Sequence, residues 1–590
     1  MGTFAFSSSS QFWMSSSRSA TASATRIAHS LRHLDARGRM PPVTRTISSR
    51  ALVVAVIPFL VASAIMIRPV ELARRTTAHL DWPHDADQFR DIAQAQTFRD
   101  QWALDDPYYL GETIWYNPLL PGVVAILSAI SGEQVHIVYV RAGPYLNLLA
   151  PLGLFAAIGY AAGPWTAVAA LFVFVFLQPP QAPAWTAATY SPWLFPGVFA
   201  QSLFYFSLVA YQRALVSRSA RRYVGLGLLW GLCFLGHTAP ALVLGCMLIV
   251  RTVAEQIRRG LRNHEPGGIA QIWGRLLAGL TAFVVAMPLV SSVLGRYHLR
   301  TLNPEPTRWG GAPLALENLR PFLSWQGALV LALAILGLVA LARQRVPRAG
   351  RVMLSDWGLA TIAIVAWAHL VDVLPAEMPT IIPRFHFLFY AGALVSVFAG
   401  LGLAWLADLS AAALGRLAGP AGRRPSAAWI PIAARCVLVL ALALAGSAVY
   451  PSYKQGRAFV ADRAAAWQMT RQRERALFVD WARTHTSPHD VFLCTDDVSL
   501  FFVGPAGRKV VAVDRFFSNP YVDWSRRAGD RDRMLATIRN RDASGFKILA
   551  DRYRVRFIVL DDDHSRNAQG FPGLEQVFAV ANASVWRRPL

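Results

Sequence analysis

Long apolar runs, separated by short polar segments, repeat along this 590-residue chain from residue 51 to residue 449. A helix needs about 20 predominantly apolar residues to cross the hydrocarbon core of a bilayer. Because most of the runs approach that length, they predict a polytopic α-helical membrane protein with about 11 spans. The runs are residues 51–67, 118–130, 137–160, 223–250, 275–294, 325–342, 357–374, 385–406 and 431–449.

Arginine clusters lie in the polar segments between the runs, at residues 213–222, 251–262, 343–351 and 416–424. Basic residues next to spans favour the cytoplasmic side of a membrane. If all four clusters are cytoplasmic, the apolar segments between them cross in even numbers, as the pairs of runs allow. This parity predicts a plasma (inner) membrane protein with a cytoplasmic N-terminus. It also places the loop at 69–117 and everything after Tyr450 outside the cytoplasm.

The two ends of the chain differ in pattern from the apolar middle. Residues 1–49 are rich in Ser and Arg and hold no apolar run, which predicts a disordered tail. In residues 451–590, short apolar stretches alternate with helical patterns, which is typical of a soluble α/β domain. Three domains are therefore predicted: the tail at 1–49, a membrane domain at 50–450 and an extracytoplasmic domain at 451–590. Strands are expected at 491–494, 509–513 and 555–560, and helices at 526–540 and 546–553.

Composition supports the membrane assignment and narrows the partners. The chain is 54% hydrophobic and only 16% charged, with a mean hydropathy of +0.34. Its net charge of +23 would suit nucleic acid, but the basic residues lie between apolar runs, so we expect no nucleic-acid partner and expect contacts with membrane lipids. Four scattered cysteines show no metal-binding or redox spacing.

The segment His84-Asp85-Ala86-Asp87, in the loop after the first run, is the first candidate for chemistry. Glycosyl transfer from a phosphate-activated donor needs a carboxylate to orient or deprotonate the acceptor hydroxyl. A D-x-D pair is also a candidate site for a divalent cation, Mg²⁺ or Mn²⁺, bound to phosphate oxygens. The alternative is that Asp85 or Asp87 only caps a helix that begins near Gln88.

The chain resembles the GT-C superfamily of polyprenyl-phosphate-dependent integral-membrane glycosyltransferases. The shared order is a first span, a long outer loop with an Asp, many spans and a soluble outer C-terminal domain. The stretches that carry the resemblance are HDADQFRDIAQAQ, ETIWYNPLLPGVVAILSAISG, ATYSPWLFPGVFAQ, GLLWGLCFLGHTAP, IIPRFHFLFYAGAL, GRKVVAVDRFFSNPYVDW and LADRYRVRFIVLDDD. It implies transfer of a sugar from a lipid-linked donor to an extracytoplasmic glycan, lipid or protein acceptor. Asp85 is the best match to the catalytic carboxylate and Asp87 the second.

Arg384, at the predicted outer mouth of a span, is the candidate for the donor phosphate. The resemblance implies an arginine in a comparable setting, and a guanidinium suits bidentate contact with phosphate. The alternative is an interfacial anchor. We expect Asp85 and Arg384 to face one cavity; if they do not, Asp87 is the next carboxylate, with His237 or His386 as the phosphate contact.

His237 lies in Gly-His-Thr-Ala-Pro, where the run at 223–250 divides into two short apolar halves. Non-helical backbone at membrane depth is tolerated inside protein or beside a water-filled cavity. His237 is therefore a candidate donor to the sugar phosphate or to an acceptor hydroxyl; the alternative is a capping histidine. Tyr116, and His84 next to Asp85, are candidate substrate contacts. The alternative for Tyr116 is an aromatic belt at the membrane interface.

Two other classes of function stay open at this point. A transporter or lipid flippase often shows internal repeats and charges at the membrane midplane. Here no repeat is evident, and the candidate charges gather on one side. A non-catalytic membrane scaffold with an outer binding domain is the third possibility. Substitution of the loop Asp separates the three, because only an enzyme loses transfer while it still folds.

Overall fold

The computed structural model describes residues 56–178, 188–217, 219–260, 268–308, 313–373, 382–417, 429–469, 471–561, 568–581 and 583–589. All of these residues belong to one compact unit. The predicted tail at 1–49 lies outside them.

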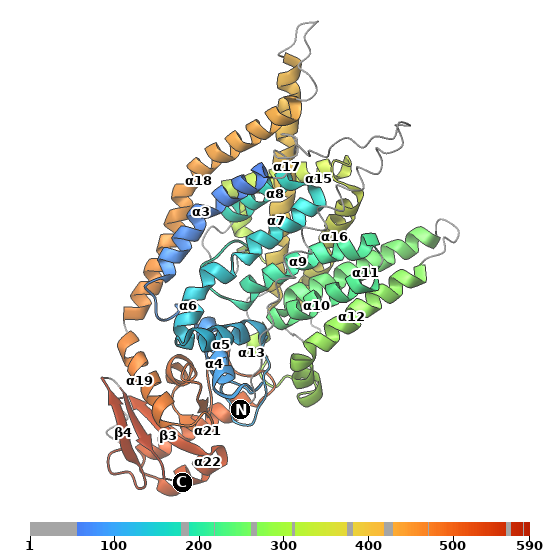
Figure 1. Ribbon diagram of the computed structural model, residues 1–590. Helices are drawn as coiled ribbons and strands as arrows, with labels where there is room; N and C mark the ends of the chain where they lie inside the picture. The colour runs from blue at the N-terminus through green and yellow to red at the C-terminus, as the bar shows by residue number, and fades with distance from the viewer. Residues whose placement is uncertain are drawn as a thin grey trace, which may run out of the picture. The chain divides into compact units, whose positions relative to one another are not determined.

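Apolar helices make up the larger part of this unit (Figure 1). Within the described ranges, seven segments are long and apolar enough to cross a membrane: residues 135–162, 238–259, 270–296, 325–342, 348–371, 384–416 and 430–456. The corresponding helices are α6 (Val135–Leu146), α7 (Leu149–Ala162), α11 (Thr238–Gly260), α12 (Gly268–Val290), α15 (Trp325–Ala342), α16 (Arg348–Val373), α17 (Phe387–Leu417) and α18 (Trp429–Met469). The protein is therefore an integral membrane protein, and the predicted fold class is confirmed.

Further helices pack with these but miss the length or hydropathy of a clear span. They are α3 (Ile57–Thr77), α5 (Leu119–Ser131), α8 (Pro164–Phe172), which continues as the π-turn η1 (Val173–Leu177), α9 (Pro196–Ser217) and α10 (Ala220–Gly236). Helix α3 shows one reason: it carries Pro69 and the charged residues Arg68 and Glu71. The predicted number of about 11 spans includes helices of this mixed kind.

Glycines set the distance between several of the packed helices. A Cβ atom at Gly337 of α15 would lie 1.8 Å from the carbonyl oxygen of Phe398 in α17. A Cβ at Gly227 of α10 would lie 2.5 Å from the carbonyl oxygen of Ala278 in α12. No side chain fits at such separations, so glycine permits these backbones to approach closely, as small residues do at membrane helix interfaces.

The turn between α10 and α11 consists of His237 alone, in extended conformation (φ −167°, ψ 139°). The sequence predicts two short apolar halves here, whereas α10 has 17 residues and α11 has 23. Helix α11 begins at Thr238, so Pro240 falls in its first turn. Proline is tolerated there because the first-turn N–H groups have no partner inside the helix.

The C-terminal part carries a five-stranded mixed sheet in the order β2-β1-β3-β5-β4. Strands β1 (Val491–Leu493), β2 (Lys509–Val510) and β3 (Val555–Asp561) are parallel, and β4 (Glu575–Val580) and β5 (Ala583–Arg587) form an antiparallel hairpin beside β3. Helices α19 (Gln472–His485), α21 (Trp524–Arg539) and α22 (Ala543–Tyr553) accompany it, with the short α20 (Asp496–Val498) and η5 (Ser499–Val503). The three parallel strands and α21 and α22 match expected elements, while the hairpin and α19 were not predicted.

Two predicted boundaries fall inside helices. Helix α18 has 41 residues and runs unbroken through residue 450, toward α19 and the sheet (Figure 1). Helix α3 continues to Thr77, past the predicted loop start at residue 69. The loop between α3 and α5 holds one helix, α4 (Ala86–Gln101).

Hydrogen bonds join this loop to the C-terminal part. The Tyr109 hydroxyl lies 2.7 Å from Ser518 Oγ, and Asn519 Nδ2 donates to Asp106 Oδ2 at 3.0 Å. Lys509 Nζ donates to the carbonyl oxygen of Asp106. These groups are buried, so breaking such a bond leaves an unsatisfied polar atom away from water. The loop is thereby held in place, and with it helix α4.

Candidate active site

A cavity of 210 Å³ lies where the loop, the α10–α11 turn and the start of α17 come together. We call it the central cavity. The short helices α13 (Glu305–Arg308) and η4 (Arg384–His386), the π-turn η2 (Ser291–Arg296) after α12, and the segment around Tyr521 complete its wall. Its polar lining includes Asp87, Arg90, Tyr116, Asn117, His237, Thr238, Thr307, His386 and Tyr521.

Helix α4 decides which of the two loop aspartates faces this cavity. Asp85 is the N-cap residue, and its Oδ1 accepts the backbone N–H of Asp87 at 3.0 Å. This is the capping role weighed above, and it satisfies one of the free N–H groups of the first turn. Burial, and then the nearby charge of Asp87, raises the pKa of Asp85 to about 6. Asp87 projects from the first turn and lines the cavity.

Asp87 begins a buried chain of charged and polar groups. Its Oδ1 lies 2.8 Å from Arg90 Nη1, an i,i+3 pair on α4. The Arg90 guanidinium also pairs with Asp91 Oδ1 at 3.0 Å and lies 3.8 Å above the centre of the Tyr116 ring. Asp91 Oδ2 accepts the hydroxyl of Tyr139 at 2.9 Å. Burial raises the pKa of Asp91 to about 6 despite the opposing charge of Arg90.

Two histidines are hydrogen-bonded to each other on the opposite wall. His237 Nε2 lies 3.1 Å from His386 Nδ1, and His237 Nδ1 accepts the backbone N–H of Ala239 at 3.3 Å. An Nδ1 that accepts leaves the proton of the neutral His237 ring on Nε2. His237 then donates to His386, whose own proton lies on Nε2. The His237 N–H is thus used within the pair, and the other neutral N–H of the pair is that of His386 Nε2.

Asn117 fixes the loop against the α10–α11 turn. Its Nδ2 donates to the carbonyl oxygen of Phe234 at 2.6 Å and to Thr238 Oγ1 at 3.3 Å. Phe234 lies in the last turn of α10, where helix carbonyls lack partners within the helix. This contact holds Tyr116, and through it Arg90, against the same turn that carries His237.

The structure brings together four of the residues singled out in the sequence: Asp87, Tyr116, His237 and His386. Within the described part of the chain, Asp85, His84 and Arg384 are not among the residues that line the central cavity. Asp85 turns back to cap α4, and the His84 ring packs edge-on against Trp193 at 4.3 Å. The expected pairing of Asp85 with Arg384 around one cavity is thus not formed here. The fallback group of Asp87 with His237 and His386 is the one that the cavity gathers.

Arg384 opens the 3₁₀ turn η4 and stands next to Pro383, a cavity residue. In this turn Phe385 is buried and His386 lines the cavity, whereas Arg384 is not among the lining residues. Its predicted role as a phosphate contact remains a prediction. Sequence analysis missed Arg90, Asn117 and Thr238; the spacing of three between Asp87 and Arg90 on an expected helix was the available signal.

An apolar groove of 650 Å³ adjoins the cavity between α10, α11, α12 and α16. It shares Phe234, Leu242 and Val290 with the cavity lining. Its other lining residues include Trp230, Gly245, Ile249, Gly279, Phe283 and Trp367. We call it the apolar groove; it extends the cavity along membrane-spanning helices.

The residues that would hold a divalent cation are engaged with other partners. Asp87 is paired with Arg90, and Asp85 Oδ1 accepts a backbone N–H. Among the described residues, no group of three or more His, Cys, Asp or Glu side chains is placed to bind a metal ion. Divalent cations of this class prefer several oxygen ligands, so this donor set does not fit one as it stands. Metal dependence stays a prediction.

Comparison with known proteins shows the fold. No family model matches the sequence, and no similar curated protein was found. Among solved structures, ArnT from Cupriavidus metallidurans bound to undecaprenyl phosphate matches with a TM-score of 0.51 and 14% identity, over 90% of this chain and 97% of its own. The same protein in the apo state matches with a TM-score of 0.50 and 14% identity, over 89% and 97%. At this identity the likeness concerns the fold alone, and it agrees with the helical membrane fold that the sequence predicts.

Proposed function

We propose that this protein transfers a sugar from a polyprenyl-phosphate-linked donor to an acceptor on the outer side of the membrane. One observation carries the proposal: the central cavity, with its group of polar side chains, shares the wall residues Phe234, Leu242 and Val290 with the apolar groove. A lipid-linked sugar has the same order of parts, a polar head followed by a long apolar tail. The tail of such a lipid lies in the hydrocarbon of the bilayer, so a groove along membrane-spanning helices binds it by van der Waals packing.

The donor phosphate is proposed to lie against the histidine pair. His386 and His237 stand where the cavity meets α11 and α17, next to Phe234 and Leu242 at the entrance to the groove. A tail that follows the groove would leave its phosphate at this point. The N–H of a neutral imidazole is a suitable donor to a phosphate oxygen, and its bond strengthens as negative charge develops on the leaving group.

Asp87 is proposed to receive or orient the acceptor hydroxyl. In the transfer, the acceptor oxygen bonds to the anomeric carbon while the bond from that carbon to the phosphate oxygen breaks. The hydroxyl proton passes to the Asp87 carboxylate, and polyprenyl phosphate leaves with the electron pair. Arg90, fixed by Asp91 and Tyr116, holds Asp87 in one position. No step in this scheme depends on a metal ion.

The structural neighbour is consistent with this donor class, since ArnT was solved with undecaprenyl phosphate bound. The acceptor is proposed to be a glycan, lipid or protein in the cell envelope. Its outer location rests on the parity of the arginine clusters.

The release of polyprenyl phosphate tests the proposal without knowledge of the sugar. Purified protein is incubated with lipid-linked sugars and with a cell-envelope fraction that supplies acceptors, both from the host, and polyprenyl phosphate is measured by mass spectrometry. We expect Asp87→Asn to lower the rate by about 10²–10⁴-fold, as loss of general acid–base help does.

Asp81→Asn is the matched control. Asp81 lies on the same loop but pairs with Arg141 at the surface, where an ion pair contributes little. Equal rates for Asp87→Asn and the native protein would contradict the role of Asp87. A flippase would be favoured if the native protein released no polyprenyl phosphate but moved intact lipid-linked sugar from one leaflet of a vesicle membrane to the other.

A further inference from the structure

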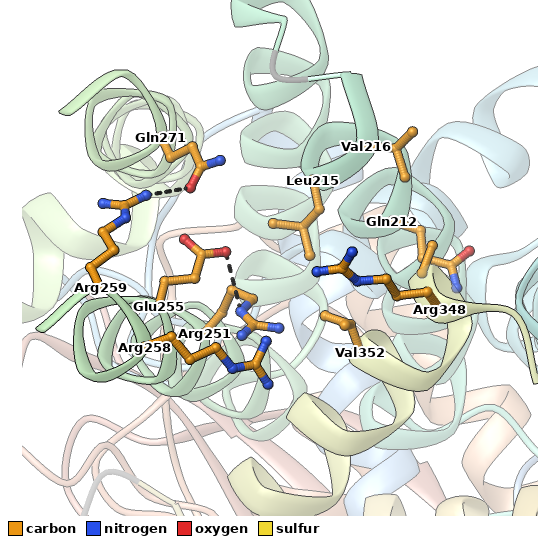
Figure 2. A pocket seen from close by; sticks show the side chains of 11 residues that line it. Gln212, Leu215, Val216, Arg251, Glu255, Arg258, Arg259, Gln271, Arg348 and Val352 are labelled. Carbon is orange, nitrogen blue, oxygen red and sulfur yellow. Dashed lines mark hydrogen bonds and ion pairs between the residues drawn. The ribbon is translucent and has the colours of Figure 1, made fainter. Parts of the chain in front are cut away.

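A second polar pocket, of 430 Å³, lies at the other end of α11 and α12 (Figure 2). The last turns of α9 and α11 and the first turns of α12 and α16 form its wall. Its charged lining consists of Arg251, Arg258, Arg259 and Arg348 with one carboxylate, Glu255. We call it the arginine pocket. Four guanidiniums against one carboxylate leave it with a net charge of +3.

The arginines fall into two groups. Arg251 is 4% exposed and lies 3.3 Å from Glu255 and 3.7 Å from Asp356, and Arg259 donates to Gln271 at 3.0 Å. Arg258 and Arg348 are exposed at the mouth. Figure 2 shows Arg348 reaching from α16 toward the side chains of α11. Arg251 and Arg259 are held by partners within the wall of the pocket, whereas Arg258 and Arg348 supply its uncompensated positive charge.

Gln212 adds an independent sign of a ligand. This side chain lines the pocket and is only 2% exposed. Over the part of the chain that the structure describes, neither its amide oxygen nor its amide nitrogen has a hydrogen-bond partner. A buried amide without hydrogen-bond partners destabilises the folded protein. A ligand that enters the pocket would remove this cost.

The position of the pocket indicates where that ligand comes from. Helix α11 begins beside the central cavity and ends at the arginine pocket, and its 23 residues span about 34 Å at 1.5 Å per residue. The hydrocarbon core of a bilayer is about 30 Å thick. The two pockets therefore lie near opposite ends of a helix that is long enough to cross the bilayer. The mouth also carries apolar side chains, Leu215, Val216 and Val352, and Val216 is 61% exposed.

We propose that the arginine pocket binds the phosphate group of an anionic membrane lipid. Arg258 and Arg348 would donate to the phosphate oxygens, and the Gln212 amide would bond to the head group. Charge-assisted bonds from arginine to phosphate are strong and directional. Leu215 and Val216 would lie along the first part of the acyl chains. A free phosphate compound shares the head-group chemistry but makes no use of this apolar border.

Native mass spectrometry of the full chain in detergent tests this proposal. The protein is mixed with equal amounts of phosphatidylglycerol and phosphatidylcholine, and the retained lipid is identified. We expect selective retention of phosphatidylglycerol, and a loss of at least about tenfold in its binding when Arg258→Gln and Arg348→Gln are combined, since each charged hydrogen bond is worth about tenfold or more. Millimolar inorganic phosphate is expected not to displace the lipid.

Arg345→Gln is the control, because Arg345 is an exposed arginine of the same cluster as Arg348 but does not line the pocket. It should leave lipid binding unchanged. Thermal unfolding without added lipid checks that each variant folds, and Arg348→Gln alone, at the surface, is the milder variant. Equal retention of both lipids, or equal loss with Arg345→Gln, would overturn the proposal. Displacement of the lipid by inorganic phosphate would assign the pocket to a soluble phosphate compound and would contradict the proposal that it binds a lipid.

Discussion

The two ends of α11 and α12 carry opposite electrostatic designs. At the central cavity, Asp87, Arg90 and Asp91 form a chain of two carboxylates and one guanidinium with a net charge of −1, and the two histidines beside it are hydrogen-bonded to each other. At the arginine pocket, four guanidiniums face one carboxylate. Paired and mutually fixed groups suit a reaction in which charge moves from one atom to another. An uncompensated positive cluster suits retention of an anion.

The contrast arises from where the helices allow polar residues. Helix α11 is apolar from Ala239 to Val250, between Thr238 at one end and Arg251, Glu255, Arg258 and Arg259 toward the other. Charge in the middle of a span is costly unless it faces protein or water. Helix α12 carries Gln271 and Arg275 near its start and brings only apolar residues to the central cavity. Of the two helices, α11 is therefore the one that contributes polar residues to both sites.

The comparison requires the central cavity and the arginine pocket to face opposite sides of the membrane. We expect a reporter fused after Leu590 and one inserted in the segment 261–267, between α11 and α12, to be active in opposite compartments, because the arginine clusters favour the cytoplasm. The outcome is all-or-none. A cytoplasm-specific reporter that is active at Leu590 would contradict the predicted orientation.

Obstruction of the apolar groove should weaken donor binding and leave the arginine pocket untouched. A Cβ at Gly279 would lie 3.7 Å from Trp230 Cζ3, an ordinary contact, so Gly279→Leu extends into the groove without a backbone clash. We expect the KM for the lipid-linked donor to rise about tenfold, since the added leucine side chain takes space from the tail and removes its van der Waals contacts along the groove. The kcat should change little, as measured by release of polyprenyl phosphate.

Gly225→Leu is the matched control for this change. Gly225 lies in α10, has open space around it and does not line the groove. An equal rise in KM for both variants would mean that the groove is not the path of the lipid tail.

A lower pH should reduce kcat/KM by a smaller factor, several-fold, through its effect on the central cavity. Burial raises the pKa of Asp91 to about 6, so its carboxylate is ionised above that pH and neutral below it. Since the ionised form holds Arg90, we expect kcat/KM to fall as the pH drops from about 7 to about 5. Asp91→Asn should be less active at pH 7 and should lose much of this dependence, and an unchanged pH profile in Asp91→Asn would contradict this assignment.

The pH dependence of stability through Asp91 has the opposite sign to that of activity. A carboxyl whose pKa is raised by folding binds its proton more tightly in the folded state. The contribution of Asp91 to the free energy of unfolding is therefore full below about pH 4, its unfolded pKa, and is lost as the pH rises through about 6. Thermal unfolding of the native protein and of Asp91→Asn across this range would measure the difference.

Local patterns in the sequence predicted the positions of the main parts. The Gly-His-Thr-Ala-Pro segment predicted a break between helices at His237, and α10 and α11 meet there. The strands at 491–493 and 555–561 were also predictable, because each is a short apolar run between polar turns. Length and hydropathy suffice for such features, since they depend on neighbours in the chain.

The choice between residues two positions apart was not predictable. Asp85 and Asp87 are equivalent in a D-x-D pattern. Because Asp85 is the N-cap residue of α4, its carboxylate accepts a backbone N–H, whereas Asp87 in the first turn lines the cavity. The same holds for Arg384 and His386, whose directions depend on the 3₁₀ turn before α17. Such orientations follow from helix starts set by tertiary packing, which single-sequence patterns place only to within a few residues.

The transfer itself is tested most directly by mass spectrometry of cell-envelope glycans and lipid-linked sugars from cells with and without this gene. We expect the deletion to remove one glycosyl substituent from the envelope and to cause one polyprenyl-phosphate-linked sugar to accumulate. A copy with Asp81→Asn should restore both, and a copy with Asp87→Asn should restore neither while the protein is present at the native level. Unchanged glycans and unchanged lipid-linked sugars in the deletion strain would contradict the proposed function.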